Sequence, residues 1–138
     1  MEGLRRSIFL CVLCAVGTGC KSPTPAEQMQ TILSWMSTAD MAAQAWLNHT
    51  TPEKYTRQTL ELSQETIRQT ADELLKAPPS DTDSSSLDSL LTRSGGRIAR
   101  MARLIEVRNA PDVMRELDSL RIDKSAVKNI ADRLEKSE

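Results

Sequence analysis

Residues 24–47 have the sequence TPAEQMQTILSWMSTADMAAQAWL, which is typical of an amphipathic helix. A threonine, a proline directly after it and a glutamate three residues after the threonine form a helix start signal. Apolar residues then recur every three or four positions, so they share one side of a helix at about 100° per residue. They are Met29, Ile32, Leu33, Trp35, Met36, Ala39, Ala43, Trp46 and Leu47. The segment therefore predicts a helix that begins at Pro25 and buries this face.

A second helix is expected after a turn at residues 48–53 and should run to about Lys76. Thr50 or Thr51 is its expected cap, with a proline in the first turn. Residues 77–86, APPSDTDSSS, end this helix because two prolines cannot continue it and the polar tract cannot pack in a core. The first half of the chain thus predicts a helical hairpin followed by a linker.

The second half of the chain predicts another hairpin. Ser85 is the expected cap of a third helix, which Gly95 and Gly96 interrupt as a kink, a close helix contact or a short break. Residues 109–112, NAPD, begin a fourth helix, and a break near residues 121–124 would divide it in two. Together the segments predict an all-α domain over residues 25–136, a small antiparallel helical bundle of about four helices in two hairpins.

The composition agrees with this fold class. Of 138 residues, 27% are charged and 3% aromatic, and five glycines and six prolines are few for an architecture of strands and turns. Residues 20–138 carry 16 basic and 18 acidic side chains, a net charge of −2. We therefore expect no nucleic acid among the partners.

The first twenty residues differ from the rest, because they divide into the three zones of a secretory signal. Arg5 and Arg6 form a basic zone, residues 7–16 an apolar zone, and residues 17–19 a small-residue approach to Cys20. An apolar run of about ten residues is too short for a helix that spans a bilayer, which needs about 20. The pattern predicts a signal helix over residues 1–19 that is cleaved from the mature chain.

The cleavage region, residues 16–20 with the sequence VGTGC, resembles the processing site of bacterial lipoprotein precursors. The resemblance covers only the start of the chain, and Gly17 stands where this family usually has an aliphatic residue. It implies cleavage between Gly19 and Cys20 and attachment of fatty acyl chains, such as palmitate, to Cys20. Residues 20–24 would then be a lipidated tether that holds the domain on the bacterial cell membrane.

The residue after the cysteine bears on the destination. Lys21 stands where enterobacterial lipoproteins kept in the inner membrane have aspartate. The resemblance therefore favours the outer membrane over the inner one, with the domain in the periplasm or at the cell surface.

Few residues suit catalysis or metal binding. His49 is the sole histidine, so histidine-rich zinc sites and serine–histidine–aspartate triads lack necessary members. Cys11 and Cys14 have the spacing of a redox or metal site, but they lie in the apolar zone of the signal. We expect no enzymatic activity, no metal and no cofactor.

Two tryptophans and one aspartate of the first helix are candidate ligand contacts. Trp35 and Trp46 point almost the same way, and they form either the bulk of the core or the lining of a ligand pocket. Asp40 falls inside the apolar stripe, where a buried carboxylate needs a partner. It is either a binding or acid–base residue or half of an ion pair with an arginine of another helix.

Charge is distributed unequally between the two hairpins. Residues 27–88 have ten acidic and four basic side chains, a net charge of −6, whereas residues 93–138 have eight and eleven, a net charge of +3. The hairpins are thus electrostatically complementary, and the arginines of the third helix are either solvated or neutralised within the fold. The alternative is a basic patch that binds anionic lipid or an acidic partner, with Arg97 and Arg100 among its contacts.

A row of hydroxyl side chains follows the second helix: Thr56, Thr59, Ser63, Thr66 and Thr70. Such a row binds a polar ligand or, as we favour, allows close helix packing while each hydroxyl bonds its own backbone.

The N-terminal resemblance and the lack of catalytic motifs favour a membrane-anchored envelope lipoprotein that serves as a non-enzymatic interaction or structural module, with an envelope protein as partner. The alternative function is a binder of a small or lipid-like ligand near Trp35, Asp40 and Trp46.

Overall fold

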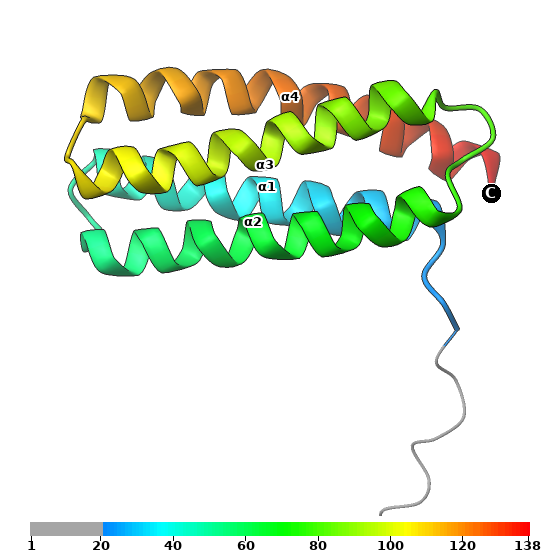
Figure 1. The fold of residues 1–138 in the computed structure, drawn as a ribbon, viewed down its shortest axis with the longest axis horizontal. Coiled ribbons are helices and arrows are strands. Elements are labelled where there is room, and N and C mark those ends of the chain that lie inside the picture. The colour runs from blue at the N-terminus through cyan, green and yellow to red at the C-terminus, as the bar shows by residue number, and fades with distance from the viewer. Residues whose placement is uncertain (1–20) are drawn as a thin grey trace, which may run out of the picture.

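The computed structural model describes residues 21–138, which fold into four α-helices (Figure 1). The helices are α1 (Pro25–Leu47), α2 (Glu53–Lys76), α3 (Ser84–Glu106) and α4 (Ala110–Ser137). Each helix packs against the next one in the chain, and α4 closes the bundle against α1. The predicted all-α bundle of two antiparallel hairpins is confirmed. The predicted signal segment, the cleavage site and Cys20 lie outside the described residues.

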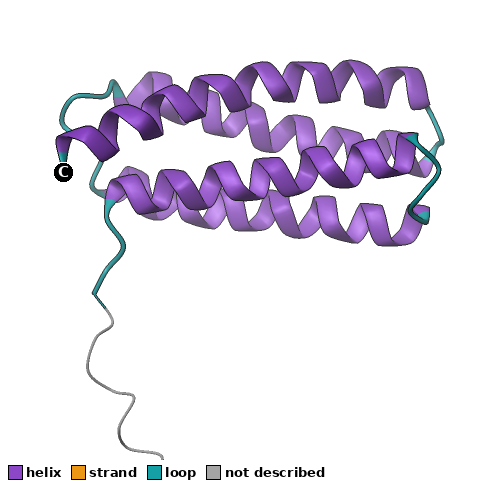
Figure 2. Cartoon of the chain, turned by 180° about the vertical axis from the view of Figure 1, so that it is seen from behind, coloured by secondary structure: helices purple, strands orange, loops and turns teal. Residues whose placement is uncertain are grey.

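The two ends of the bundle carry different connections (Figure 2). The tether end holds Thr24, the linker at 77–83 and the C-terminus, and the distal end holds the turns at 48–52 and 107–109. Glu138, after the last residue of α4, contacts the start of α1, because its carboxylate accepts hydrogen bonds from Thr24 Oγ1 at 2.9 Å and from the Ala26 N–H at 3.3 Å. None of the described helices combines the length and the apolar character of a membrane span.

The apolar stripes of all four helices meet in one core. The largest fully buried side chains are Met29, Ile32 and Met36 of α1, Leu60, Ile67 and Leu74 of α2, Leu87, Ile98, Met101 and Ile105 of α3, and Leu117 and Leu120 of α4. Burying one such side chain contributes roughly 1.5–3 kcal/mol. The edges of the α1 stripe are only partly buried and pack against this core from the side, namely Leu33, Trp35, Trp46 and Leu47.

Two helix starts follow the sequence prediction. At α1, Thr24 Oγ1 accepts the Glu27 N–H at 3.2 Å, and the Glu27 carboxylate accepts the Thr24 N–H at 2.8 Å. This reciprocal pair is the capping box that the sequence predicts. At α4, the Asn109 side chain accepts the Asp112 N–H at 3.2 Å. Both capping signals involve residues at most three positions apart, so they do not depend on how the helices pack.

The other two helix starts differ from the prediction. Neither Thr50 nor Thr51 caps α2, since Pro52 occupies the cap position and no side chain caps it. Thr50 instead donates its hydroxyl to the Ala45 carbonyl at 2.9 Å, at the end of α1. Asp83, not Ser85, caps α3 by accepting the Ser85 N–H at 3.2 Å. The linker is therefore 77–83, shorter than the predicted 77–86.

Neither of the predicted helix breaks occurs. Helix α3 continues through Gly95 and Gly96, and a Cβ atom built on either glycine would meet nothing within 4 Å, so no close helix contact explains them. Helix α4 continues through residues 121–124 as far as Ser137. Its Asp123 side chain, which would cap a separate helix, is buried and pairs with arginines of α3 instead.

The two turns at the distal end share one backbone motif. His49 and Arg108 are the residues with positive φ, 58° and 55°, in the described chain. In each turn, two successive backbone N–H groups donate to carbonyl groups in the last turn of the preceding helix, as in a Schellman motif. After α1, the N–H of His49 donates to the Trp46 carbonyl and that of Thr50 to the Ala45 carbonyl. After α3, the N–H of Arg108 donates to the Ile105 carbonyl and that of Asn109 to the Leu104 carbonyl. Glycine usually occupies this position because it has no Cβ penalty there.

Replacing His49 or Arg108 with glycine is therefore expected to raise the free energy of unfolding by about 0.5–1 kcal/mol each, since relief of left-handed strain exceeds the added entropy of the unfolded chain. Both side chains are exposed, and the 3.4 Å pair of Arg108 with Glu53 lies at the surface, so little else is lost. Urea denaturation measures the change. His49→Ala is the matched control and should give no gain, because alanine keeps the Cβ atom; a gain equal to that of glycine would contradict this explanation.

Candidate functional site

Asp40 is tied into the fold by two cations of α4. Its side chain is 13% exposed, and its carboxylate accepts from Arg121 Nη2 at 2.8 Å and from Lys124 Nζ at 2.9 Å. Burial raises the pKa of Asp40, but the hydrogen bonds and charges of Arg121 and Lys124 lower it by more, so this pKa lies below its ordinary value of 3.8. Of the two alternatives for Asp40, the structure has the interhelical ion pair, with Lys124 as a second partner.

The two tryptophans do not converge with Asp40. Trp35 and Trp46 are partly buried against the core. At about 100° per residue they lie roughly 120–140° around α1 from Asp40, whose hydrogen bonds define the α4 side of the helix. The three residues predicted as one ligand site therefore occupy different sides of α1.

The predicted contacts Arg97 and Arg100 are engaged by acidic residues of α4. Arg97 Nε lies 2.9 Å from Asp123 Oδ2, and Arg100 Nη1 lies 2.7 Å from Glu116 Oε1. Arg93 Nη2 also reaches Asp123, at 2.8 Å. These arginines are therefore neutralised within the second hairpin rather than across the two hairpins.

Complementarity between the two hairpins is carried by fewer pairs. At the distal end, Arg57 lies 3.4 Å from Glu106 and Arg108 lies 3.4 Å from Glu53, so the pairs join α2 to the end of α3 and to the turn that follows it. The pairs that Asp40 forms join α1 to α4. The charge asymmetry of the sequence indicates that the hairpins attract one another, but it does not identify which arginines do so.

The hydroxyl groups in the row along α2 form hydrogen bonds with the backbone of the same helix. Four of its members donate to the carbonyl four residues earlier: Thr56 to Pro52 at 3.1 Å, Thr59 to Tyr55 at 3.0 Å, Ser63 to Thr59 at 2.8 Å and Thr66 to Leu62 at 2.9 Å. Thr56 and Ser63 are fully buried. The predicted hydrogen bonds of these hydroxyls to their own backbone are confirmed for all four, and burial in the helix packing for Thr56 and Ser63.

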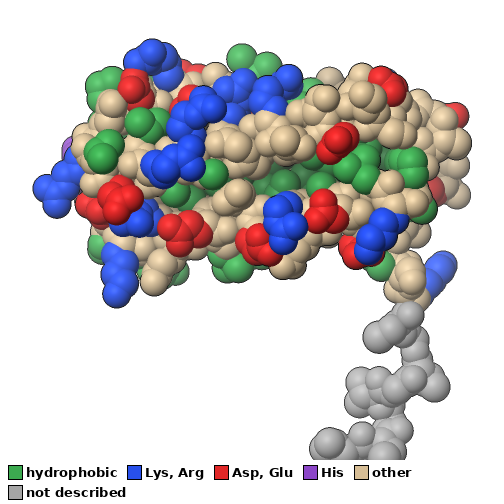
Figure 3. All heavy atoms as spheres, viewed as in Figure 1, with side chains coloured by type: hydrophobic (Ala, Val, Ile, Leu, Met, Phe, Trp, Pro, Cys, Tyr) green, Lys and Arg blue, Asp and Glu red, His purple; other side chains and the backbone are tan. Residues whose placement is uncertain are grey.

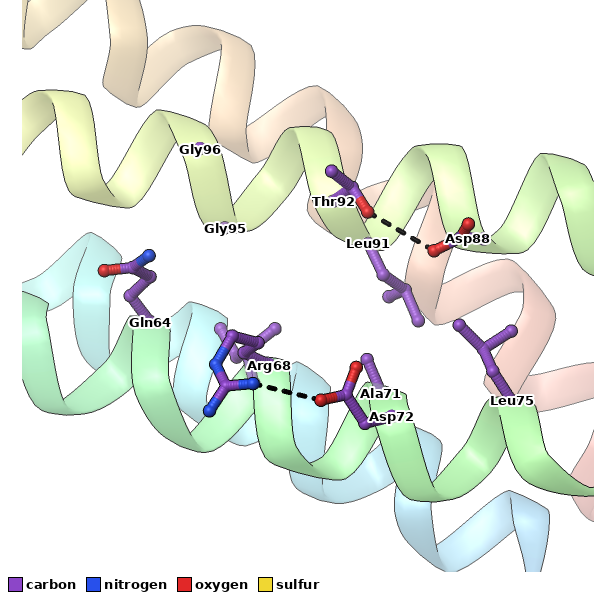
Figure 4. A pocket seen from close by; sticks show the side chains of 11 residues that line it. Gln64, Arg68, Ala71, Asp72, Leu75, Asp88, Leu91, Thr92, Gly95 and Gly96 are labelled. Carbon is purple, nitrogen blue, oxygen red and sulfur yellow. Dashed lines mark hydrogen bonds and ion pairs between the residues drawn. The ribbon is translucent and has the colours of Figure 1, made fainter.

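A groove between α2 and α3 is the candidate functional site. It has a volume of about 420 Å³ and is lined by Gln64, Ile67, Arg68, Ala71, Asp72, Leu75, Asp88, Leu91, Thr92, Gly95 and Gly96. In Figure 4, Leu91 points from α3 toward Ala71 and Leu75 of α2, whereas Thr92 and Asp88 lie along α3 and Arg68 and Asp72 along α2. On the molecular surface, hydrophobic side chains form a band between charged ones on this face, toward the tether end (Figure 3). The volume is within the range of about 300–1,000 Å³ for ligand sites.

The floor of the groove is apolar and is widened by the two glycines. Ile67, Ala71 and Leu75 contribute from α2 and Leu91 from α3, while Gly95 and Gly96 contribute no side chain. Each glycine costs about 1 kcal/mol relative to alanine inside a helix. Since the space beside each Cβ position is empty, the packing of this chain does not require the glycines. The groove was not predicted from the sequence, where Gly95 and Gly96 indicated a kink, a close helix contact or a short break, although this glycine pair was the signal for it.

The rim of the groove is charged and mostly acidic. On the α2 side, Arg68 is held by Glu65 at 2.8 Å and by Asp72 at 3.1 Å. These contacts lower the pKa of Glu65 and raise that of Arg68, chiefly through the hydrogen bond between them. On the α3 side, Asp88 accepts the Thr92 hydroxyl at 3.3 Å, and within residues 21–138 it has no ion-pair partner.

Within the described part of the chain, no three histidine, cysteine or carboxylate side chains gather as a metal site would require. Comparison of the chain with protein-family models, curated proteins and solved structures finds no match.

Proposed function

We propose that the protein is a lipid-anchored module of the bacterial cell envelope that acts by binding another protein, without catalysing a reaction. The observation that carries the binding role is the α2–α3 groove, whose apolar floor is held open by two glycines that the fold itself does not need. A feature that costs stability and fills no structural need is typical of a functional site.

The anchoring role is supported by the N-terminal pattern and by the place where the chain leaves the bundle. Only residues 21–24 separate Cys20 from α1, and four residues span at most about 14 Å. Acyl chains on Cys20 would therefore keep the tether end close to the membrane. Each buried CH₂ contributes about 0.8 kcal/mol, so two or three chains would hold the protein there stably.

Replacing Cys20 with alanine tests the anchor. We expect the wild-type chain to begin at Cys20, to carry a diacyl or triacyl mass and to stay with the membrane fraction after washing with high salt. Density-gradient separation of the membranes then tests the outer-membrane destination. Cys20→Ala should remove the acyl mass and the membrane attachment, whereas Ser22→Ala, two residues away, should change neither. An unmodified wild-type chain would refute the proposal and return Cys11 and Cys14 to consideration.

A small or lipid-like ligand is the second candidate for the binding role. The groove volume of about 420 Å³ favours it, because open sites of this size accept such molecules. Its place would be between α2 and α3 rather than beside Trp35, Asp40 and Trp46, which lie on different sides of α1.

A further inference from the structure

We propose that the α2–α3 groove binds an amphipathic helix of a partner protein, one that places apolar side chains on the groove floor and lysine or arginine against its acidic rim. This inference rests on the proposed interaction role and specifies the chemistry of the partner. It follows from the shape of the floor, the small residues in it and the charge around it.

The shape of the groove suits a helix. Its α2 wall extends from Gln64 to Leu75, which at 1.5 Å per residue is about 16 Å, or three helical turns. The floor residues Ile67, Ala71 and Leu75 are four apart, and such rows form the ridges against which another helix packs. A docked helix presents anchors at i, i+3, i+4 and i+7, a length of about two turns, which this floor accommodates.

The two glycines set how closely a partner can approach. Helix axes pack 8–10 Å apart according to the size of the side chains between them, so residues without side chains permit the shorter distance. A Cβ atom on Gly95 or Gly96 would meet no other atom within 4 Å, so the space beside these glycines is not filled by the chain's own side chains. A backbone that lies close along α3 fills this space.

The charge of this region selects a basic partner. The charged side chains that line the groove are Arg68, Asp72 and Asp88, one basic and two acidic. They lie within residues 61–96, which have a net charge of −4, while the whole chain has a net charge of only −1. Arg68 is already held by Glu65 and Asp72, whereas Asp88 accepts only the Thr92 hydroxyl within the described chain. A lysine or arginine on the docked helix would pair with Asp88, and such complementarity contributes mainly to specificity and association rate.

Photo-crosslinking of the full chain in bacterial cells tests the proposal. A photo-reactive phenylalanine analogue is placed at Thr92, on the rim of the groove, and in a control chain at Lys128, an exposed residue of α4. We expect the Thr92 probe to crosslink one amphipathic segment with flanking lysine or arginine, identified by mass spectrometry of the crosslinked peptide, and the Lys128 probe not to do so. Crosslinks to phospholipid, to a second copy of this chain or to an acidic segment would overturn the proposal.

Two variants of the probe chain separate binding from folding. Gly95→Leu fills the groove and replaces a poor helix former with a good one, so the melting temperature should stay or rise while the crosslink yield falls at least tenfold. Asp88→Lys should lower the yield similarly, and reversal of the matching basic residue in the partner should restore it. Asp118→Lys, an exposed site on α4, is the control with an unchanged yield. A folded Gly95→Leu chain with full crosslinking would contradict the proposal.

Acylation and crosslinking, measured in the same cells, show separately whether the lipid anchor and the helix-binding groove are correct. If Cys20 carries no lipid but Thr92 still crosslinks a basic amphipathic segment, the groove assignment stands and the anchor fails. If the chain is acylated and membrane-bound but its Thr92 probe reacts with phospholipid, the anchor stands and the helix-binding groove fails.

Discussion

Replacing Asp123 with alanine is expected to lower the free energy of unfolding by about 2–3 kcal/mol, because a buried acceptor of charged hydrogen bonds is removed from between two helices. Asp123 is 3% exposed and accepts from Arg93 at 2.8 Å and from Arg97 at 2.9 Å. Its loss leaves Arg97, which is 23% exposed, with only the 3.4 Å contact to Glu116. Arg93 is half-exposed and can return to water, so the cost stays below the 3–5 kcal/mol of a fully buried pair.

Urea denaturation followed by helical circular dichroism measures this change. Asp118→Ala is the matched control, since it removes the same group from the same helix at a position that is 68% exposed and 3.5 Å from Arg121. Surface pairs of this kind contribute about 0–1 kcal/mol, so the control should be close to wild type. Asp123→Asn should fall between the two, because the amide keeps one acceptor but not the charge. Equal effects of Asp123→Ala and Asp118→Ala would show that burial of Asp123 does not determine its contribution.

The sequence predicts the elements of this fold because their signals are local. The α1 capping box needs only residues 24–27, and the α4 start needs only residues 109–112. The apolar stripes repeat within each helix, so burial on one side follows from the periodicity alone. Where two neighbouring polar residues compete for one cap, as Asp83 and Ser85 do before α3, the pattern does not decide between them.

The candidate site was less predictable because it depends on which side chains face one another across helices. The sequence offers an ion pair with an arginine of another helix as one of two alternatives for Asp40, but it does not decide between them or choose Arg121. Asp123 has the pattern of a helix cap, and only the packing of α3 on α4 turns it into an acceptor for Arg93 and Arg97.

The groove depends on packing in the same way. Gly95 and Gly96 leave space on α3 opposite Gln64 and Arg68 of α2, while Ala71 lies opposite Leu91 (Figure 4). A pair of glycines within a continuous apolar stripe is therefore a signal for a surface hollow as well as for a helix break.

Replacing Asp40 with asparagine is expected to lower the free energy of unfolding at pH 7 by about 1–2 kcal/mol. The side chain keeps its size, but the charge that holds Arg121 at 2.8 Å and Lys124 at 2.9 Å is lost. Both cations are partly exposed, 42% and 28%, and Arg121 retains Asp118 at 3.5 Å, which keeps the loss moderate. Asp132→Asn, on a surface pair with Lys128, is the matched control with little effect.

The difference in the free energy of unfolding between wild type and Asp40→Asn should also depend on pH. The pKa of Asp40 is lower in the folded chain than its ordinary value of 3.8, so the unfolded chain binds the proton first as the pH falls. The stability that Asp40 contributes is therefore fully present well above about pH 4, decreases below it, and is lost once the pH passes the folded-state pKa. Denaturation curves of the two chains, measured from neutral to strongly acidic pH, should converge over this window. A difference that is constant with pH would show that the cost of Asp40→Asn arises from packing and not from the ion pair.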